Sequence, residues 1–139
     1  MTTTHITHSE DETQAVERDL ASRIRPGDVV LLSGSLGAGK TAFVRGLAVG
    51  LGIDPGEVSS PTFTLIHEYR GGRLVLYHAD LYRLGSAASE DLGLEEAGAR
   101  TGVLAIEWPE RLARTPPGPV TVTIDMVDES TRRIVIQGA

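Results

Sequence analysis

The sequence predicts an α/β fold with a mixed, partly antiparallel sheet, and three adjoining segments support this prediction. Residues 34–41 read GSLGAGKT and match the pattern G-x-x-x-x-G-K-[ST]. The apolar run 29–32 precedes this pattern, and apolar residues recur at helical spacing over 43–51. A strand, a glycine-rich loop and a helix in this order form a phosphate-binding loop, because glycines let backbone N–H groups converge on an anion. We therefore predict a three-layer variant of the P-loop NTPase fold.

The segments before the loop predict an edge strand and a first helix. Residues 2–7 alternate weakly, as in a short strand at a sheet edge. Ser9 followed by Glu12 has the spacing of a capping box, and apolar positions continue on one helical face until the Pro26-Gly27-Asp28 turn. We expect the run 29–32 beyond this turn to be a buried parallel strand.

The segments after the loop predict further strands. The runs with strand character are 63–69, 74–80, 103–106, 120–126 and 132–137. The first two runs are joined across a glycine pair and the last two across Asp128-Glu129-Ser130, so each pair is expected to form an antiparallel hairpin. Residues 86–100 favour one or two short acidic helices, and the prolines of 115–119 require a turn.

The composition limits the domain organisation and the classes of function. The 139 residues are expected to form one domain, 1–139, and no apolar run approaches the length of a membrane span. The chain has no cysteine, which excludes disulfides and thiolate metal sites and favours the cytoplasm. The net charge of −6 disfavours a strong non-specific grip on nucleic acid.

Lys40 is the only lysine in the chain, which contains twelve arginines. A P-loop places this lysine against the β- and γ-phosphates and uses the following hydroxyl, here that of Thr41, as a ligand of Mg²⁺. An incidental glycine-rich turn is the alternative, but the flanking strand and helix supply the context that the motif requires. The residues expected to bind the nucleotide here are Gly34, Ser35, Leu36, Gly37, Ala38, Gly39, Lys40 and Thr41.

Two acidic residues, Asp80 and Glu107, each end a strand candidate. Ligands of α/β sheets bind beyond the carboxyl ends of strands, where a carboxylate can hold Mg²⁺ directly or through water, or orient an attacking water. The alternative for each residue is a solvated carboxylate or a helix N-cap. The spacing favours a metal-linked role and leaves open which of the two contacts the ion.

Other candidate residues each have two interpretations. Residues Ser60-Pro61-Thr62 lie where GTPases carry a switch loop, and they belong either to such a loop or to a plain β-turn. Trp108, the only tryptophan, is a core anchor or a partner contact. His67 and His78 have no matching set of ligands, so ordinary packing is expected rather than zinc binding.

The absence of asparagine bears on the nucleotide. Without asparagine and without a second lysine the chain has neither N-K-x-D nor T-K-x-D, the guanine-reading motifs, so ATP is the expected nucleotide. No arginine-rich lid of the kind found in small-molecule kinases is evident, although Arg111 and Arg114 keep that option open.

Four linked motifs follow one another in chain order: LGAGKT at 36–41, SPTFTL at 60–65, YHADLYRL at 77–84 and IEWP at 106–109. Together they resemble the TsaE family, the bacterial ATPases of tRNA threonylcarbamoyladenosine biosynthesis. The resemblance extends from the turn at 26–28 to the final hairpin, nearly the whole chain.

The resemblance implies roles for individual residues. Lys40 and Thr41 would hold phosphate and Mg²⁺, Glu107 would be a second magnesium residue, and Asp80 would be the Walker-B-type acid. Catalysis would therefore involve Lys40, Asp80 and Glu107. Thr62 would belong to the switch-like loop. Thr13 and Arg132, which are matched more loosely, would lie near the nucleotide.

The resemblance also implies a cytoplasmic, weak Mg²⁺-dependent ATPase that works with TsaB-like and TsaD-like proteins, is stimulated by them, and meets tRNA only through their complex. Ser35 departs from the family, which usually has an acidic residue there, so any role of that acid in hydrolysis or partner contact is in doubt. A small-molecule kinase and an ATP-dependent binding switch with little hydrolysis are the alternative functions.

Overall fold

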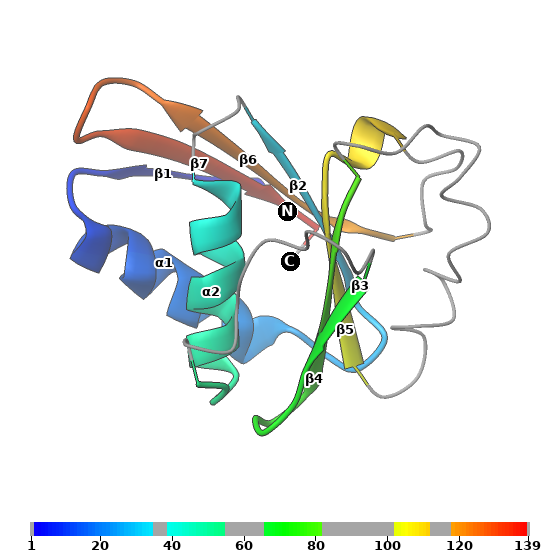
Figure 1. Ribbon diagram of the computed structural model, residues 1–139. Coiled ribbons are helices and arrows are strands. Elements are labelled where there is room, and N and C mark those ends of the chain that lie inside the picture. The colour runs from blue at the N-terminus through cyan, green and yellow to red at the C-terminus, as the bar shows by residue number, and fades with distance from the viewer. Residues whose placement is uncertain (1, 35–38, 55–65, 82–101, 112–117, 139) are drawn as a thin grey trace.

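The computed structural model describes residues 2–34, 39–54, 66–81, 102–111 and 118–138 (Figure 1). Its elements in chain order are β1 (Thr2–Thr7), α1 (Glu10–Arg23), β2 (Val29–Gly34), α2 (Lys40–Gly50), β3 (Ile66–Tyr69), β4 (Val75–Asp80), β5 (Gly102–Glu107), the 3₁₀ helix η3 (Pro109–Arg111), β6 (Val120–Met126) and β7 (Arg132–Gln137). None of the described helices is long and apolar enough to cross a membrane.

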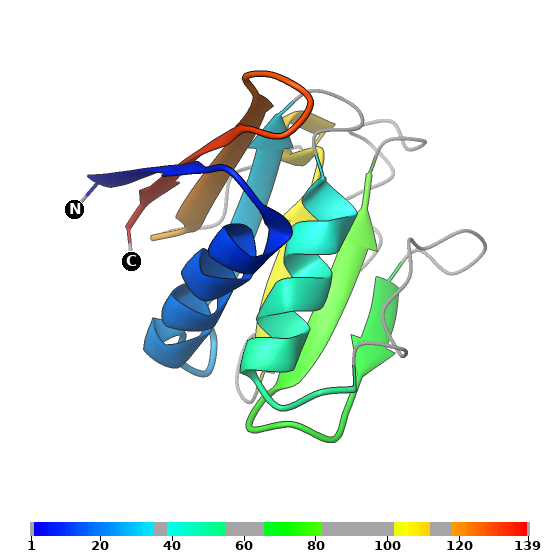
Figure 2. The same ribbon diagram turned by 90° about the vertical axis from the view of Figure 1, so that its left-hand side faces the viewer.

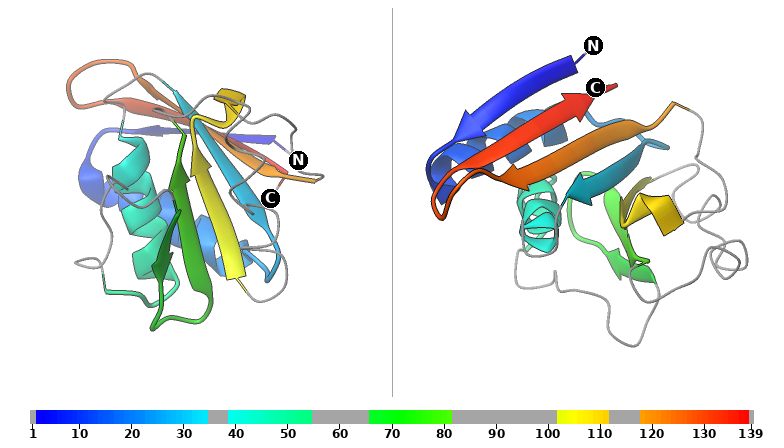
Figure 3. Two further views of the ribbon diagram at one scale, coloured as in Figure 1. Left: turned by 45° about the vertical axis from the view of Figure 1, so that its right-hand side comes forward. Right: turned by 90° about the horizontal axis from the view of Figure 1, so that it is seen from above.

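The seven strands form one sheet in the order β1-β7-β6-β2-β5-β4-β3. β2 lies between β5 and β6 and is parallel to both, and β4 is parallel to β5. The β3–β4, β6–β7 and β1–β7 pairs are antiparallel. The prediction of a mixed, partly antiparallel sheet is therefore confirmed, as are the two hairpins and the N-terminal edge strand. Because β1 pairs with β7, the two ends of the chain lie side by side (Figure 3).

Alternation along the strands divides the core between the two faces of the sheet. α1 and α2 both cover one face (Figure 2), where Val30 and Leu32 of β2 pack with Phe43 and Leu47 of α2. On the other face Leu31 of β2 packs in a second cluster, together with residues of β4 and β5. A strand that is buried on both faces has a continuous apolar sequence, which is why the run 29–32 predicts β2 correctly.

The two helices begin as their sequences predict. Ser9 is the N-cap of α1, and its hydroxyl accepts a hydrogen bond from the Glu12 backbone N–H at 3.1 Å. The Glu12 carboxylate accepts from the backbone N–H of His8 at 2.9 Å, one residue earlier than in a standard capping box. α2 begins at Lys40 after Gly39, whose φ of 102° is accessible to glycine at little cost.

Glycines allow α1 and α2 to approach closely. A Cβ on Gly50 would lie 2.5 Å from the Cβ of Ala21, and a Cβ on Gly46 would overlap the side chain of Glu17. The close contact fixes the position of α2, which begins at Lys40, relative to α1.

Several predictions concern residues that the structure does not describe. These are the start of the 63–69 run, the helices expected within 86–100, and most of the turn at 115–119. In the described part of the chain both α-helices lie on the same face of the sheet.

We predict that Gly34→Ala destabilises the fold more than Gly118→Ala. Gly34 has a φ of 138°, and a Cβ there would lie 2.0 Å from the carbonyl oxygen of Ile124 on β6. Gly118 also has a positive φ, of 62°, but a Cβ on it would meet no atom within 4 Å. We expect Gly34→Ala to lower the free energy of unfolding by about 1–3 kcal/mol more than Gly118→Ala, measured by urea denaturation. Equal losses in the two variants would contradict the backbone clash.

Candidate functional site

Lys40 lies at the junction of β2 and α2, with its side chain turned back toward the strand. Its Nζ donates a hydrogen bond to the carbonyl oxygen of Gly34 at 3.0 Å, and the residue is 4% exposed. The same Nζ lies 3.5 Å from the centroid of the Trp108 ring. This distance permits a cation–π interaction, which stabilises a buried ammonium in the absence of an anion. Residues 35–38 of the loop lie outside the described residues.

Trp108 connects the end of β5 to the lysine. Its backbone has a φ of 62°, an uncommon value for a residue with a side chain. Its half-buried side chain packs against the core cluster on the face opposite the helices. The structure thus assigns Trp108 a packing role together with a contact to Lys40.

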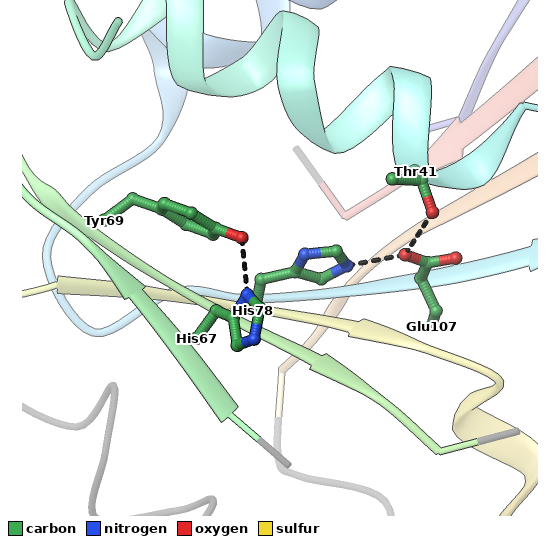
Figure 4. Close-up of polar contacts among 5 residues, drawn as sticks. All are labelled: Thr41, His67, Tyr69, His78 and Glu107. Atoms are coloured by element: carbon green, nitrogen blue, oxygen red, sulfur yellow. Dashed lines mark hydrogen bonds and ion pairs between the residues drawn. The ribbon is translucent and has the colours of Figure 1, made fainter. Parts of the chain in front are cut away.

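Thr41 and Glu107 come together although they are far apart in the sequence. The Thr41 hydroxyl donates a hydrogen bond to Glu107 Oε2 at 2.9 Å (Figure 4). β5 lies beside β2, with Glu107 in register with Leu32, so the end of β5 faces the first turn of α2. Glu107 is only 3% exposed, so its carboxylate needs polar partners inside the protein.

His78 supplies the second partner, and the sequence analysis missed this contact. His78 on β4 is 0% exposed, and its Nε2 lies 2.5 Å from Glu107 Oε2. His78 is therefore packed in the core, as expected, and in addition contacts Glu107. The sequence did contain one signal. A polar side chain within a buried strand needs a hydrogen-bond partner, and His78 lies two positions before an acid, Asp80.

His67 belongs to a separate contact on β3. Its Nδ1 pairs with the Tyr69 hydroxyl at 2.8 Å. Burial lowers the pKa of His67. Within the described ranges no three His, Asp or Glu residues gather as a metal-binding cluster.

The structure describes the backbone of Asp80 but not its side chain. This residue ends β4 directly in register with Glu107, the last residue of β5. The two strand ends are thus neighbours at the edge of the sheet where parallel α/β folds bind ligands. The side chain of Asp80, and all of Ser60-Pro61-Thr62, lie outside the described part of the structure.

A cavity of about 570 Å³ opens beside the loop, bounded by α1, α2 and the turn between β6 and β7. Gly39, Thr13 and Arg132 all line it. Thr13 also bonds to Thr7 through its hydroxyl, at 2.7 Å. The structure thus brings the two loosely matched residues, Thr13 and Arg132, to one cavity with the end of the P-loop.

Glu17 is a second functional candidate that the sequence analysis missed. It lines the same cavity from α1, is 4% exposed, and packs over Gly46. Burial raises the pKa of its carboxyl group from 4.5 to about 8, although the charge of Arg18 opposes the shift. Glu17 follows Thr13 by four residues and precedes Leu20 by three. That spacing on the buried helix face is the signal that could have identified it.

The oxygen groups near the loop suit a magnesium ion. Mg²⁺ prefers oxygen ligands and commonly takes one or two from the protein, with water and substrate phosphates supplying the others. The Thr41 hydroxyl and the Glu107 carboxylate are such a pair, and the Asp80 position adjoins them.

The chain is similar to proteins of one family. The family model described as "Threonylcarbamoyl adenosine biosynthesis protein TsaE" matches residues 7–135. The Treponema pallidum protein named tRNA threonylcarbamoyladenosine biosynthesis protein TsaE is 48% identical over 115 residues, which are 81% of this chain and 84% of that protein. The Bacillus subtilis protein of the same name is 44% identical over 125 residues, 89% of this chain and 78% of that protein.

A solved structure shows the same fold. The crystal structure of Bacillus subtilis YdiB aligns with a TM-score of 0.77 and 36% sequence identity, covering 98% of this chain and 84% of that one. This likeness extends over the whole sheet and both described helices, and it confirms the predicted fold class.

We predict that Glu17 makes stability fall with rising pH. Its folded-state pKa of about 8 exceeds the usual value of 4.5, so between these values the folded protein keeps a proton that the unfolded chain releases. The free energy of unfolding should therefore decrease from about pH 5 to 8, by at most about 1.4 kcal/mol per pH unit, and this contribution should level off above that range.

The matched variant is Glu17→Gln, which has the same shape and does not titrate. Urea denaturation across this pH range should show a stability gain of Glu17→Gln over the wild type that grows with pH. Parallel curves for the two proteins would contradict a raised pKa.

Proposed function

The chain belongs to the TsaE family of tRNA threonylcarbamoyladenosine biosynthesis proteins, and we propose that it is an ATP-binding and ATP-hydrolysing accessory protein of that pathway. One observation carries this proposal. Lys40 and Thr41 follow a central parallel strand at the start of a helix, and Thr41 is hydrogen-bonded to the buried carboxylate of Glu107. A phosphate-binding lysine, a hydroxyl and a strand-end carboxylate are the parts that phosphoryl transfer requires.

Phosphate binding is assigned to the first turn of α2 and to Lys40. The backbone N–H groups at a helix N-terminus attract anions. When a nucleotide enters, the Lys40 ammonium exchanges the Gly34 carbonyl and the Trp108 ring for phosphate oxygens, which form stronger, charge-assisted hydrogen bonds.

Thr41 and Glu107 would hold Mg²⁺, with Asp80 at the adjoining strand end. The ion would neutralise charge on the β- and γ-phosphates. The protein's own contribution is to hold the Thr41 hydroxyl and the Glu107 carboxylate in fixed positions before the nucleotide arrives.

The cavity beside Gly39 is proposed to take the base and sugar of the nucleotide. Its volume of about 570 Å³ is typical of small-molecule sites. Thr13 and Arg132 offer a hydroxyl and a guanidinium group at its wall. Adenine is favoured because the chain has no asparagine with which to build the guanine-reading motif.

The reaction we propose is in-line attack of water on the γ-phosphate. Lys40 and the loop N–H groups stabilise the charge that develops on the phosphate oxygens. TsaB-like and TsaD-like proteins are the proposed partners, through which the chain meets tRNA and which raise a slow basal rate. Stabilising groups supplied by a partner accelerate phosphoryl transfer by about 10³–10⁵ in systems that use them.

The test is steady-state ATP hydrolysis by the purified chain, alone and with the TsaB-like and TsaD-like proteins of its own organism. A slow rate that rises sharply with these partners is expected. Hydrolysis that ignores the partners but rises with a small hydroxyl acceptor would favour a kinase. Partner binding that depends on ATP, without turnover, would favour a switch.

We predict that Lys40→Ala weakens binding of Mg²⁺-ADP by about 100-fold or more, because the site loses its charge-assisted hydrogen bonds to phosphate. Isothermal titration calorimetry measures the dissociation constant. Arg133→Ala is the control, because it also removes one positive charge but from an exposed ion pair with Asp125. Affinity of Lys40→Ala equal to that of this control would reject the P-loop assignment.

A further inference from the structure

We propose that His78 is a positioning residue for Glu107, holding its carboxylate in the orientation that the metal–nucleotide complex requires. The proposal rests on the ATP site proposed above and adds to it a side chain that would touch neither the nucleotide nor the metal. His78 acts on the site through a single hydrogen bond, from its Nε2 to Glu107 Oε2 at 2.5 Å.

The sheet brings His78 to Glu107. β4 and β5 are parallel neighbours, with His78 in register with Ala105 and Asp80 in register with Glu107. The side chains of Leu76 and Ala105 belong to the core cluster beneath α1 and α2, so His78 and Glu107, two residues further along their strands, lie on that same face. Glu107 therefore lies between His78 on one side and Thr41 of α2 on the other (Figure 4).

The hydrogen-bond pattern determines which histidine nitrogen carries the proton. An ionised carboxylate only accepts hydrogen bonds, so His78 must donate from Nε2. Its Nδ1 is buried and has no hydrogen-bond partner within the described residues. A proton on Nδ1 would leave a buried N–H unsatisfied, so this environment favours the proton on Nε2.

One carboxylate oxygen accepts both bonds, and this restricts the orientation of the group. Glu107 Oε2 accepts from His78 and from the Thr41 hydroxyl, while the other oxygen points away from both donors (Figure 4). With both hydrogen bonds in place the carboxylate group cannot rotate freely. Without His78, the bond from Thr41 would be the only one of the two that still restrains it. Because the Thr41 hydrogen is directed at Glu107, the lone pairs of the hydroxyl oxygen face away from the carboxylate.

The neighbours of His78 hold its ring in place. The Tyr69 ring lies 6.4 Å from it, measured between ring centroids, and Tyr69 is 5% exposed. The Tyr69 hydroxyl is itself paired with His67 Nδ1 at 2.8 Å (Figure 4). Groups that orient a metal-binding carboxylate commonly change metal affinity about 10- to 100-fold when they are removed.

The test compares His78→Leu with His78→Gln. Leucine keeps apolar bulk and removes the donor, whereas the glutamine amide nitrogen is as many bonds from the backbone as histidine Nε2 and restores it. Electron paramagnetic resonance would measure Mn²⁺ affinity in the ADP-bound protein, and calorimetry would measure ADP affinity without metal. We expect His78→Leu to weaken Mn²⁺ binding about 10- to 100-fold, to change metal-free ADP binding by less than about twofold, and His78→Gln to recover most of the loss.

Two results would overturn the assignment while leaving the proposed function intact. One is wild-type Mn²⁺ affinity in a folded His78→Leu protein. The other is equal weakening of ADP binding with and without metal, which a merely structural role would cause. Failure of the wild type itself to bind ADP would instead reject the proposed function, and this assignment with it.

Two further measurements test the proposal even if the His78→Leu protein does not fold. His78→Asn keeps a polar side chain whose amide is too short to reach Glu107, so it should show the same loss as His78→Leu. Nitrogen-15 NMR of the wild type reads the tautomer directly, and a proton found on Nδ1 rather than Nε2 would overturn the proposal without any variant.

Discussion

The buried carboxylate of Glu107 is the constraint on which the rest of the site depends. A carboxylate that is 3% exposed is costly unless donors surround it, and the fold supplies two, Thr41 from α2 and His78 from β4. These contacts tie the first turn of the P-loop helix to two neighbouring strands. The same group that would hold a metal therefore also determines how the helix meets the sheet.

The strand order explains why Glu107 lies close to Thr41 of α2 and His78 of β4. β2 is central and parallel to β5, and β4 follows as the next parallel strand, so three carboxyl ends lie at one edge of the sheet. That edge carries Gly34 at the end of β2, Glu107 at the end of β5 and Asp80 at the end of β4. The sheet is extended by β6, which is parallel to β2, and by the antiparallel strands β7, β1 and β3, and the turn between β6 and β7 closes the cavity beside Gly39.

Local patterns predicted most of the elements and few of the contacts. The Ser9 cap, the start of α2 after Gly39 and the two hairpins are encoded within a few residues, so sequence reasoning found them. The bond from Thr41 to Glu107 spans 66 residues, and the partner of His78 depends on which strand lies beside β4. Glu17 looks like a solvated acid of a charged helix. Its helical spacing with Thr13 and Leu20 hints at burial, and the packing of α1 on Gly46 establishes it.

Two buried charges face the nucleotide site, and the protein compensates each in a different way. Lys40 rests on a carbonyl oxygen and an aromatic ring, and neither contact carries a full opposite charge. Glu107 has two directed hydrogen bonds, and the one from His78 comes from a ring that lies wholly in the core. A cation–π contact is worth about 2 kcal/mol when it is desolvated, less than ammonium–phosphate hydrogen bonds at a helix N-terminus provide together. Entry of a phosphate would therefore displace the partners of Lys40 and leave those of Glu107 in place. On the proposed function, the lysine would be the part of the site that moves, and the carboxylate with its histidine would keep its position.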